Sequence, residues 1–292
     1  MSDDRATVRP ITLARLVETA YVCQSEAYST TDIEERLDVS HRRARSVLLE
    51  ALRIGLLDGS DDAYTTTGTG SSFVDATTAQ NWSQVNSILE SGSPHYAMFL
   101  DVVREIGPAR LETVLDALER NAEPSSYTYN QASVEVLGDW AERLETVQRN
   151  AFTGEYYYPT ENKQLADFAE ILLGTLDDLE ETTGAGMRQR YLSIPEVRET
   201  FCAHQQISRE TFDRALETLA QQNVGRLELS GAPMDTSAKE ASYGIKEIAL
   251  ADGDELVSTS QSTDKVMQGV EQYGKQYYYL TIHDRNLTYD HE

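Results

Sequence analysis

The sequence lacks the features that mark disulfide-rich, zinc-binding, membrane-embedded and secreted proteins. Only two cysteines occur among 292 residues, and neither lies at a zinc-site spacing from a histidine or another cysteine. No run of about 18 apolar residues is present, which argues against a membrane-spanning helix. The first residues also lack the basic-then-apolar order of a secretory signal. We therefore expect a cytoplasmic protein without a membrane partner.

Sequence motifs for catalysis are also missing. The chain has no phosphate-binding loop, nucleophile elbow, zinc-protease histidine pair or dinucleotide fingerprint. Its five histidines are dispersed along the chain. Carboxylates are so frequent that pairs at helical spacing say nothing specific about catalysis. We therefore expect a protein that is not an enzyme and that binds neither a cofactor nor a metal.

Lysine is scarce and acidic residues are abundant. Asp and Glu number 49 against 25 Lys and Arg, and the net charge is −24. This composition resembles that of proteins from extreme halophiles. At molar salt the Debye length falls to about 3 Å, so self-repulsion is screened while the charge keeps the protein in solution. The acidity therefore does not exclude nucleic-acid binding, and any basic cluster stands out against it.

Residues 8–80 carry the pattern of a winged helix-turn-helix domain. An apolar helical pattern precedes residues 31–34, which have the spacing of a capping box that opens a short second helix. Ser40 is suited to cap a third helix. We expect that helix to end near Ile54, because Gly55 is suited to its C-terminal cap. In such a domain the third helix is the recognition helix.

Two short strands are expected to follow this helix. Leu56 and Leu57 would form the first strand, Tyr64 to Thr67 the second, and the polar residues between them a turn. Residues 11–75 resemble archaeal winged-helix regulator domains of the halophile type. The resemblance covers about a quarter of the chain and is one of fold, not of a single family. It implies DNA binding through the third helix.

Two further regions show a similar order of helices followed by strands. Residues 93–160 predict a second winged-helix-like domain. Residues 187–292 predict a third domain, which is either winged-helix-like with an enlarged wing or an unrelated α+β domain. Between them, residues 163–182 have one broad apolar face. This segment would be a linker helix that packs on its own chain, or a dimerisation helix.

The predicted fold class is therefore mainly α with small β-hairpins, an α+β chain of tandem winged-helix-like domains joined by a linker helix. Two runs of three tyrosines, at residues 156–158 and 277–279, place tyrosines on both faces of predicted strands. Ordinary half-buried strands explain these runs. The alternative is a partner surface or a homodimer contact, because tyrosine is both apolar and hydrogen-bonding.

The predicted recognition helix carries the one basic cluster of the chain. Its apolar residues fall on one side at helical spacing, which leaves arginines on the other side. The N-terminal part of a recognition helix enters the major groove of double-stranded DNA, where side chains contact bases and phosphates. The residues expected to contact DNA are His41, Arg42 and Ser46 for bases and Arg43, Arg45 and Arg53 for phosphates. Alternatively, these arginines pair with nearby carboxylates, namely Glu34, Glu35, Asp38 and Glu50.

The other two predicted recognition helices are less basic. The second begins with the uncharged residues Asn130, Gln131 and Ser133, and the third mixes arginines with carboxylates near Arg209. Neither pattern suits strong phosphate contact, so these helices would serve to bind protein partners.

Together these patterns predict a DNA-binding winged-helix protein that acts as a transcriptional regulator of a halophilic archaeon. The alternative is a non-catalytic adaptor subunit of a larger protein complex that handles DNA in antiviral defence, chromosome organisation or replication. The length of the chain favours the adaptor, because simple archaeal regulators are usually shorter. The identity of the binding partners distinguishes the two hypotheses.

Overall fold

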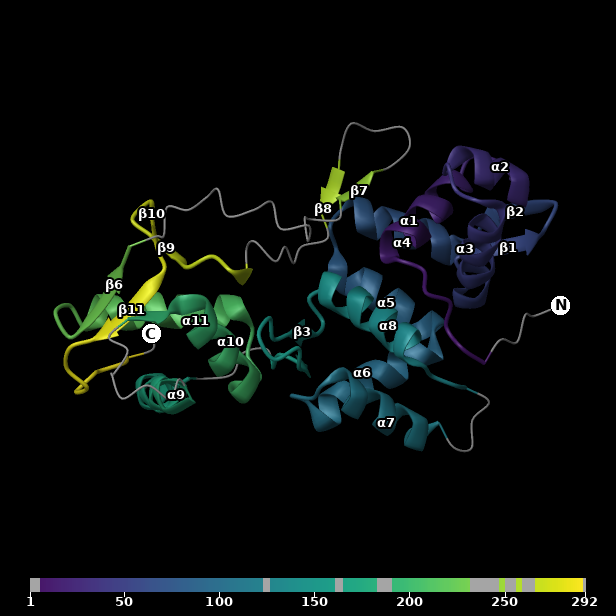
Figure 1. Ribbon diagram of the computed structural model, residues 1–292. Helices are drawn as coiled ribbons and strands as arrows, with labels where there is room; N and C mark the ends of the chain where they lie inside the picture. The colour runs from purple at the N-terminus through teal and green to yellow at the C-terminus, as the bar shows by residue number, and fades with distance from the viewer. Residues whose placement is uncertain are drawn as a thin grey trace. The chain divides into compact units, whose positions relative to one another are not determined.

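The computed structural model describes residues 6–122, 127–160, 165–182, 191–231, 247–249, 256–258 and 266–290 (Figure 1). These residues form mainly helices with small antiparallel strand pairs, which confirms the predicted α+β class. The chain divides into two compact units. The first unit comprises residues 1–147 and 245–261, and the second comprises residues 148–244 and 262–292.

The first unit begins with three helices and a hairpin in the predicted order. The elements are α1 (Leu13–Val22), α2 (Thr30–Arg36), α3 (His41–Ile54), β1 (Leu57–Ser60) and β2 (Ala63–Thr66). β1 and β2 pair antiparallel, and Tyr28, which precedes α2, forms an isolated antiparallel bridge with Tyr64 on β2. Tyr28 therefore pairs with β2 as a single bridged residue, at the place where a third strand would lie.

The caps of these helices follow from local side chains. α2 starts earlier than the capping box expected at residues 31–34: Ser29 is its N-cap, and the side chains of Ser29 and Asp32 bond each other's backbone N–H. Ser40 caps α3 as predicted, and Gly55 ends it with a left-handed φ of 83°. These signals fix the two ends of the predicted recognition helix.

Five more helices of the first unit follow among the described residues. They are α4 (Gly68–Thr78), α5 (Trp82–Gly92), α6 (Pro94–Ile106), α7 (Leu111–Asn121) and α8 (Gln131–Arg143). α5 packs against α3, α4 and α6. Trp140 on α8 is fully buried and donates its indole N–H to the carbonyl of Ile11, at 2.8 Å. α8 is thus anchored to the segment that leads into α1.

The predicted domain at residues 93–160 does not coincide with either compact unit. Helices α6 to α8 belong to the first unit, whereas the hairpin of β3 (Gln148–Arg149) and β4 (Tyr156–Tyr157) belongs to the second. Tyr157 is fully buried in the core of the second unit. Hydrophobic spacing identifies the apolar face of each helix, but it does not reveal which other element covers that face.

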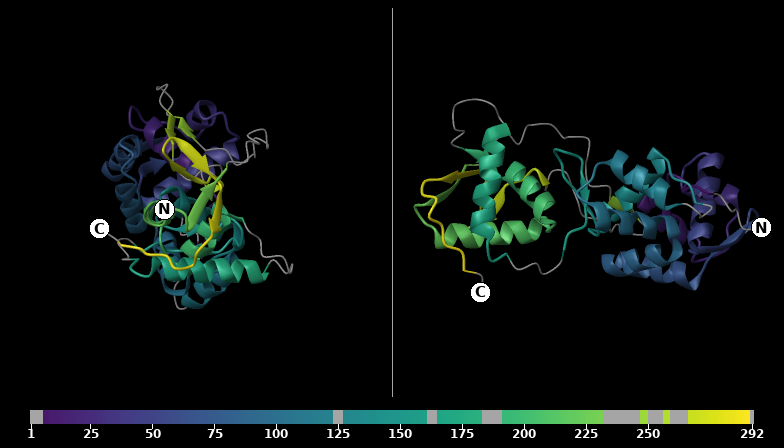
Figure 2. Two further views of the ribbon diagram at one scale, coloured as in Figure 1. Left: turned by 90° about the vertical axis from the view of Figure 1, so that its left-hand side faces the viewer. Right: turned by 90° about the horizontal axis from the view of Figure 1, so that it is seen from below.

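The second unit repeats the element order seen at the start of the first. Its elements are α9 (Phe168–Thr182), β5 (Leu192–Ser193), α10 (Ile194–Gln205), α11 (Arg209–Gln222), β6 (Leu227–Ser230) and β11 (Tyr279–Ile282). The three strands form one antiparallel sheet in the order β5-β11-β6, and β6 and β11 lie side by side in Figure 2. A helix, a strand or bridged residue, two helices and a strand pair therefore follow one another in both units.

Between β6 and β11 the second unit carries a further hairpin, β9 (Val270–Gln272) and β10 (Lys275–Tyr277), which the sequence patterns did not predict. β7 (Glu247–Ala249) and β8 (Leu256–Ser258) also pair antiparallel and are grouped with the first unit. Residues 232–246, 250–255 and 259–265 lie outside the described ranges.

The predicted linker helix is an internal part of the second unit. Phe168, Leu172 and Leu176 on α9 are buried in the same core as Phe201 of α10 and Phe212 of α11. The ring of Phe168 lies 5.1 Å from that of Phe201, centroid to centroid, and Figures 1 and 2 show α9 against α10. Two roles were expected for residues 163–182, and in the structure α9 packs on its own chain. Residues 163 and 164 lie outside the described ranges.

Candidate nucleic-acid interface

α3 presents one buried side and one exposed side, as the sequence predicts. Ala44, Val47, Leu48 and Ala51 are completely buried and Ile54 nearly so. The first turn begins after the N-cap Ser40, whose side chain accepts the N–H of Arg43. His41, Arg42 and Arg43 therefore occupy the first three helical positions. The inward apolar face turns their side chains away from the core.

Two of the basic side chains in this first turn have partners within the first unit. His41 Nδ1 lies 2.9 Å from Glu34 Oε2, and both groups are partly exposed. Arg43 Nη1 donates a hydrogen bond of 3.2 Å to the carbonyl of Pro10. Arg42 differs from both. Its side chain is exposed, and among the described residues it has no hydrogen-bond or ion-pair partner.

One turn further along α3, Arg45 and Ser46 also lie at the surface. Arg45 Nη2 is 3.7 Å from Asp61 Oδ2 in the β1–β2 turn, and the two side chains are 57% and 63% exposed. Exposed pairs of this kind contribute about 0–1 kcal/mol to stability, so Arg45 can exchange its partner easily. The Ser46 hydroxyl donates to the carbonyl of Arg42 at 2.9 Å. Its oxygen can still accept a hydrogen bond.

The structure removes Arg53 from the expected phosphate contacts. Its side chain is only 13% exposed and forms an ion pair with Glu50, which is completely buried. Arg53 Nη1 also lies 3.0 Å from Nδ1 of His95 on α6. Glu50 further accepts the backbone N–H of Arg9 at 3.2 Å. Arg53 therefore pairs with a nearby carboxylate, Glu50, which is the alternative that the sequence allowed for these arginines. It also links α3 to α6 through His95.

The basic first turn of α3 is not explained by helix stability. The N-terminus of a helix carries a partial positive charge, so cations there are disfavoured by about 0.3–1 kcal/mol each. α3 has no acidic residue in its first turn. The free backbone N–H groups and the arginines together make this end attractive to an anion such as a phosphate. Arg42, Arg43 and Arg45 are the cations that remain available near it.

The surroundings of this end are acidic. Asp58, Asp61 and Asp62 are all exposed in or next to the β1–β2 turn. The surface that can accept a phosphate is therefore narrow and is confined to the N-terminal half of α3. In the sequence the three carboxylates are visible, but only the fold brings Asp61 to Arg45.

The helix at the corresponding place in the second unit, α11, has its N-terminal end covered and its first arginine paired. α11, like α3, has 14 residues and a serine N-cap, Ser208. Its first residue, Arg209, is held by two hydrogen bonds to Glu199 of α10, of 2.5 and 2.8 Å. Glu199 is completely buried and Arg209 is 12% exposed. Burial alone would lower the pKa of the Arg209 guanidinium, but the hydrogen bond and the charge of Glu199 raise it above the ordinary value.

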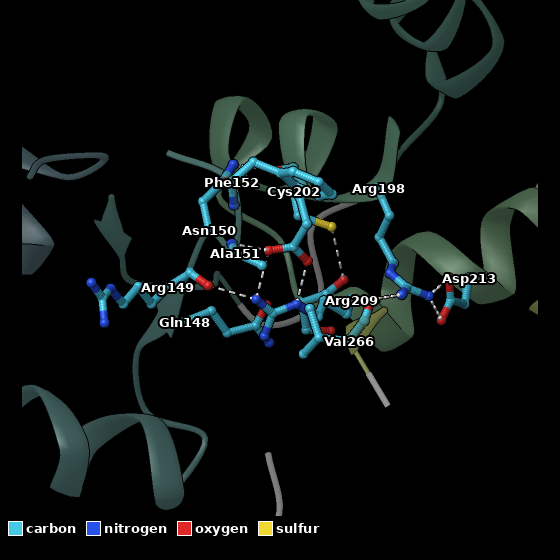
Figure 3. Close-up of polar contacts among 12 residues, drawn as sticks. Gln148, Arg149, Asn150, Ala151, Phe152, Arg198, Cys202, Arg209, Asp213 and Val266 are labelled. Atoms are coloured by element: carbon cyan, nitrogen blue, oxygen red, sulfur yellow. Dashed lines mark hydrogen bonds and ion pairs between the residues drawn. The ribbon is translucent and has the colours of Figure 1, made fainter. Parts of the chain in front are cut away.

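The β3–β4 loop completes this closure (Figure 3). Arg209 Nη2 donates to the carbonyl of Arg149 at 2.7 Å, and the backbone N–H of Ala151 donates to Glu199 at 2.7 Å. Asn150 donates to the Glu199 carbonyl at 3.0 Å and accepts the N–H groups of the two loop residues that follow Ala151. The loop is thus tied to the N-terminal end of α11, and that end of the helix holds no available arginine.

A second buried arginine holds the other side of α11 (Figure 3). Arg198 of α10 donates from Nη1 to both carboxylate oxygens of Asp213, at 3.0 and 2.9 Å. Its Nη2 donates to the carbonyl of Gln268, at 2.8 Å, and to that of Val266. Burial raises the pKa of the Asp213 carboxyl, although Arg198 opposes this shift. Sequence reasoning missed Arg198 and Glu199 because their partners lie on other elements.

The described residues hold no candidate metal site or membrane-spanning helix beside the surface of α3. Among the described residues, no group of three or more histidine, cysteine or carboxylate side chains is placed to hold a metal ion. Cys23 and Cys202 are buried, and burial raises the pKa of both thiols. Within the described ranges, no helix has the length and the apolar composition needed to cross a membrane. No protein-family model, curated protein or solved structure matches this chain.

Proposed function

We propose that this protein binds double-stranded DNA through the N-terminal half of α3 and acts as a transcriptional regulator. Both units are, in this proposal, winged-helix domains, because in each a helix, a short strand or bridged residue, two helices and a strand pair follow in the order of that fold. The carboxylate-rich, lysine-poor composition supports the proposal that the protein comes from a halophilic archaeon. Only the first unit reads DNA, so each chain has one reading helix.

The observation that carries the proposal is the state of the arginines on α3. Arg42 is exposed and has no side-chain partner among the described residues, and Arg45 has an exposed pair that contributes little to stability. Arg42 is at the second helical position, where side chains of recognition helices reach base edges. We assign base contacts to His41, Arg42 and Ser46 and phosphate contacts to Arg43 and Arg45.

The test compares Arg42→Ala and Arg45→Ala with Arg214→Ala, an exposed arginine on α11 that pairs with exposed Glu210. Fluorescence anisotropy with genomic and random duplexes, at stated salt concentrations, gives the affinities. We expect Arg42→Ala to cost about 1–3 kcal/mol of binding on preferred duplexes, and Arg45→Ala to weaken all duplexes alike and reduce the salt slope by about 1. Arg214→Ala should bind like the wild type.

Stability is measured on the same variants to separate loss of contact from loss of fold. Arg42→Ala should leave the free energy of unfolding unchanged within about 0.5 kcal/mol, or raise it slightly, because alanine is the better helix former and a cation at the helix N-terminus is removed. Duplex binding by Arg42→Ala and Arg45→Ala that equals the wild type in multimolar KCl overturns the proposal.

A second function has support from the closure of α11. A non-catalytic adaptor subunit of a complex for antiviral defence, chromosome organisation or replication would use a winged helix that cannot accept phosphate as a protein-binding module. The Arg209–Glu199 pair and the β3–β4 loop give α11 this property. Affinity purification from the native organism distinguishes the two functions. Co-purification of a large ATPase or nuclease supports the adaptor, and self-association alone supports the regulator.

A further inference from the structure

Asp61 is the one carboxylate of the β1–β2 turn that faces an arginine of α3. Its Oδ2 lies 3.7 Å from Nη2 of Arg45. Its Oδ1 accepts the hydroxyl of Tyr64 at 3.0 Å, and its backbone carbonyl accepts the N–H of Thr30 at 3.2 Å. Tyr64 is buried, and Thr30 is the first residue of α2. Asp61 is therefore held from two sides while its second oxygen points at Arg45.

The neighbouring carboxylates do not share this arrangement. Asp58 accepts the N–H of the next residue, Gly59, at 2.8 Å. Asp62 is exposed and, among the described residues, has no hydrogen-bond or ion-pair partner. Asp61 and Asp62 are adjacent, carry the same charge and lie in the same turn. Of the contacts that distinguish Asp61 from Asp62, the one with Arg45 is the contact with a cation, and it is the one that a DNA phosphate would compete for.

Fold stability does not account for the Asp61–Arg45 contact, because exposed pairs contribute about 0–1 kcal/mol. Its consequence for a DNA ligand is larger. A phosphate that approaches Arg45 has to displace Asp61 and meets the repulsion of its negative charge. Phosphate contacts supply nearly all of non-specific binding, whereas base contacts discriminate between sequences. A carboxylate fixed beside a phosphate-binding arginine therefore weakens non-specific binding more than it weakens base reading.

We propose that Asp61 is a specificity-determining residue that competes with the DNA backbone for Arg45. The inference rests on the proposed function, since it needs α3 to contact duplex DNA. In this arrangement the turn does not bind phosphate itself; it lowers the affinity for duplexes of any sequence. Discrimination then depends on His41, Arg42 and Ser46. The competition is strongest at low salt and is screened at molar salt.

The experiment uses Asp61→Asn and its matched control Asp62→Asn in the full chain. The asparagine side chain keeps an oxygen that can accept the Tyr64 hydroxyl, so the turn is preserved while the charge is removed. Anisotropy titrations with a random duplex, at the lowest salt concentration at which the wild type stays folded, should show about three- to tenfold tighter binding for Asp61→Asn. Asp62→Asn should change the affinity by less than about twofold. The ratio of preferred to random affinity should fall in Asp61→Asn only.

A double-mutant cycle with Arg45→Gln isolates the contact. If Asp61 acts through Arg45, the gain from Asp61→Asn shrinks to that of Asp62→Asn once Arg45 is replaced. A gain of equal size in both backgrounds shows that Asp61 acts as a general negative charge and overturns the proposal. No gain, or a loss, in the wild-type background also overturns it.

The failure of this inference can be told apart from the failure of the proposed function. If Arg42→Ala weakens binding while Asp61→Asn behaves like Asp62→Asn, DNA binding by α3 stands and the role of Asp61 falls. If neither the wild type nor any variant binds duplex DNA, both fall together. Thermal unfolding of Asp61→Asn checks that the turn is intact, and a midpoint near that of the wild type is expected.

Discussion

α3 and α11 are two helices of equal length, with the same type of cap and the same place in their units, yet their arginines have opposite surroundings. Arg42, at the second position of α3, is exposed and has no side-chain partner in the part of the chain that the structure describes. Arg209, at the first position of α11, is paired with a buried carboxylate. The difference does not lie in the helices themselves. It comes from α10, which supplies Glu199, and from the β3–β4 loop, which covers the helix end. The local sequence of a recognition helix therefore does not determine whether that helix is available.

The sharpest test of this contrast is Glu199→Ala. It leaves the Arg209 guanidinium, which is 12% exposed, without its carboxylate, and losing one partner of a buried pair costs about 3–5 kcal/mol. The second unit should therefore unfold at lower urea than in the wild type. The control is Glu210→Ala, whose exposed pair with Arg214 should contribute about 0.5 kcal/mol or less.

The two units can be followed separately in this experiment. Both tryptophans, Trp82 and Trp140, lie in the first unit, so their fluorescence reports that unit alone, while circular dichroism reports both. Glu199→Ala should shift the dichroism transition and leave the fluorescence transition in place. An equal effect of Glu199→Ala and Glu210→Ala would show that the α11 pair is not structural, and the contrast with α3 would then fail.

Arg53→Ala tests the contrast within α3 itself. Arg53 lies at the other end of the same helix and is paired with buried Glu50, so it should behave like Arg209 and not like Arg42. We expect a loss of about 1–3 kcal/mol, since Glu50 keeps one other arginine, Arg9, as a partner. The tryptophan fluorescence transition in urea measures this loss. Duplex binding, measured well below the unfolding midpoint, should stay within about twofold of the wild type.

A different result would change the boundary of the interface. If Arg53→Ala loses duplex binding and keeps its stability, Arg53 would again be assigned a phosphate contact. Arg42→Ala serves as the opposite control, because it should lose binding and keep its stability.

How far the sequence predicted these features depends on the range of the interactions. Ser40 and Gly55 mark the ends of α3 by contacts within a few residues, and its apolar face follows from helical spacing. The same reasoning placed Arg53 at the surface. Spacing along α3 shows that Glu50 is one turn away, but it does not show that Arg9 and His95, from other segments, pack around the Arg53–Glu50 pair and bury it. Local patterns thus predicted the helix and five of its surface residues, but not the burial of Arg53.

The division into units was beyond the sequence for the same reason. The sequence order of helices and strands after residue 93 matched a further winged-helix domain, and the helices and the hairpin do exist. They belong to different units because Trp140 is tied to Ile11 while Tyr157 enters the other core. Both contacts join residues on different elements. No spacing rule within one segment predicts such contacts.

The serine caps of α3 and α11 should contribute equally to stability, because the two helices start in the same way. Ser40 accepts the N–H of Arg43 at 3.4 Å, and Ser208 accepts that of Thr211 at 3.1 Å. Replacing either serine with alanine should cost about 1 kcal/mol. Urea titrations followed by fluorescence for Ser40→Ala and by dichroism for Ser208→Ala measure the two values. Costs that differ by more than about twofold would mean that the helices do not start in equivalent ways.

The smallest effect concerns the pH dependence of the first unit. His95 Nε2 lies 2.7 Å from the carbonyl of Ala6, which can only accept, so Nε2 is the donor and Nδ1 accepts from Arg53. Burial lowers the pKa of His95 below its ordinary value, although the bond to Ala6 opposes this. The unfolded chain then takes up the proton first, so stability contributed by neutral His95 is present above about pH 6.5 and is lost as the pH falls toward the folded-state pKa.

The second unit offers the matched control for this dependence, since His204 on α10 is exposed. Below about pH 6.5 the wild type should lose fluorescence-detected stability faster than His95→Gln, while His204→Gln should follow the wild type. The neighbouring charges of Glu50, Arg9 and Arg53 are present in the wild type and in His95→Gln alike, so they cancel when the stabilities of these two proteins are subtracted. Equal slopes in all three proteins would show that His95 does not couple α3 to α6 through its neutral form. In that case Glu50 alone would hold Arg53. The Arg53–Glu50 pair of α3 would then resemble the Arg209–Glu199 pair of α11 more closely than we infer.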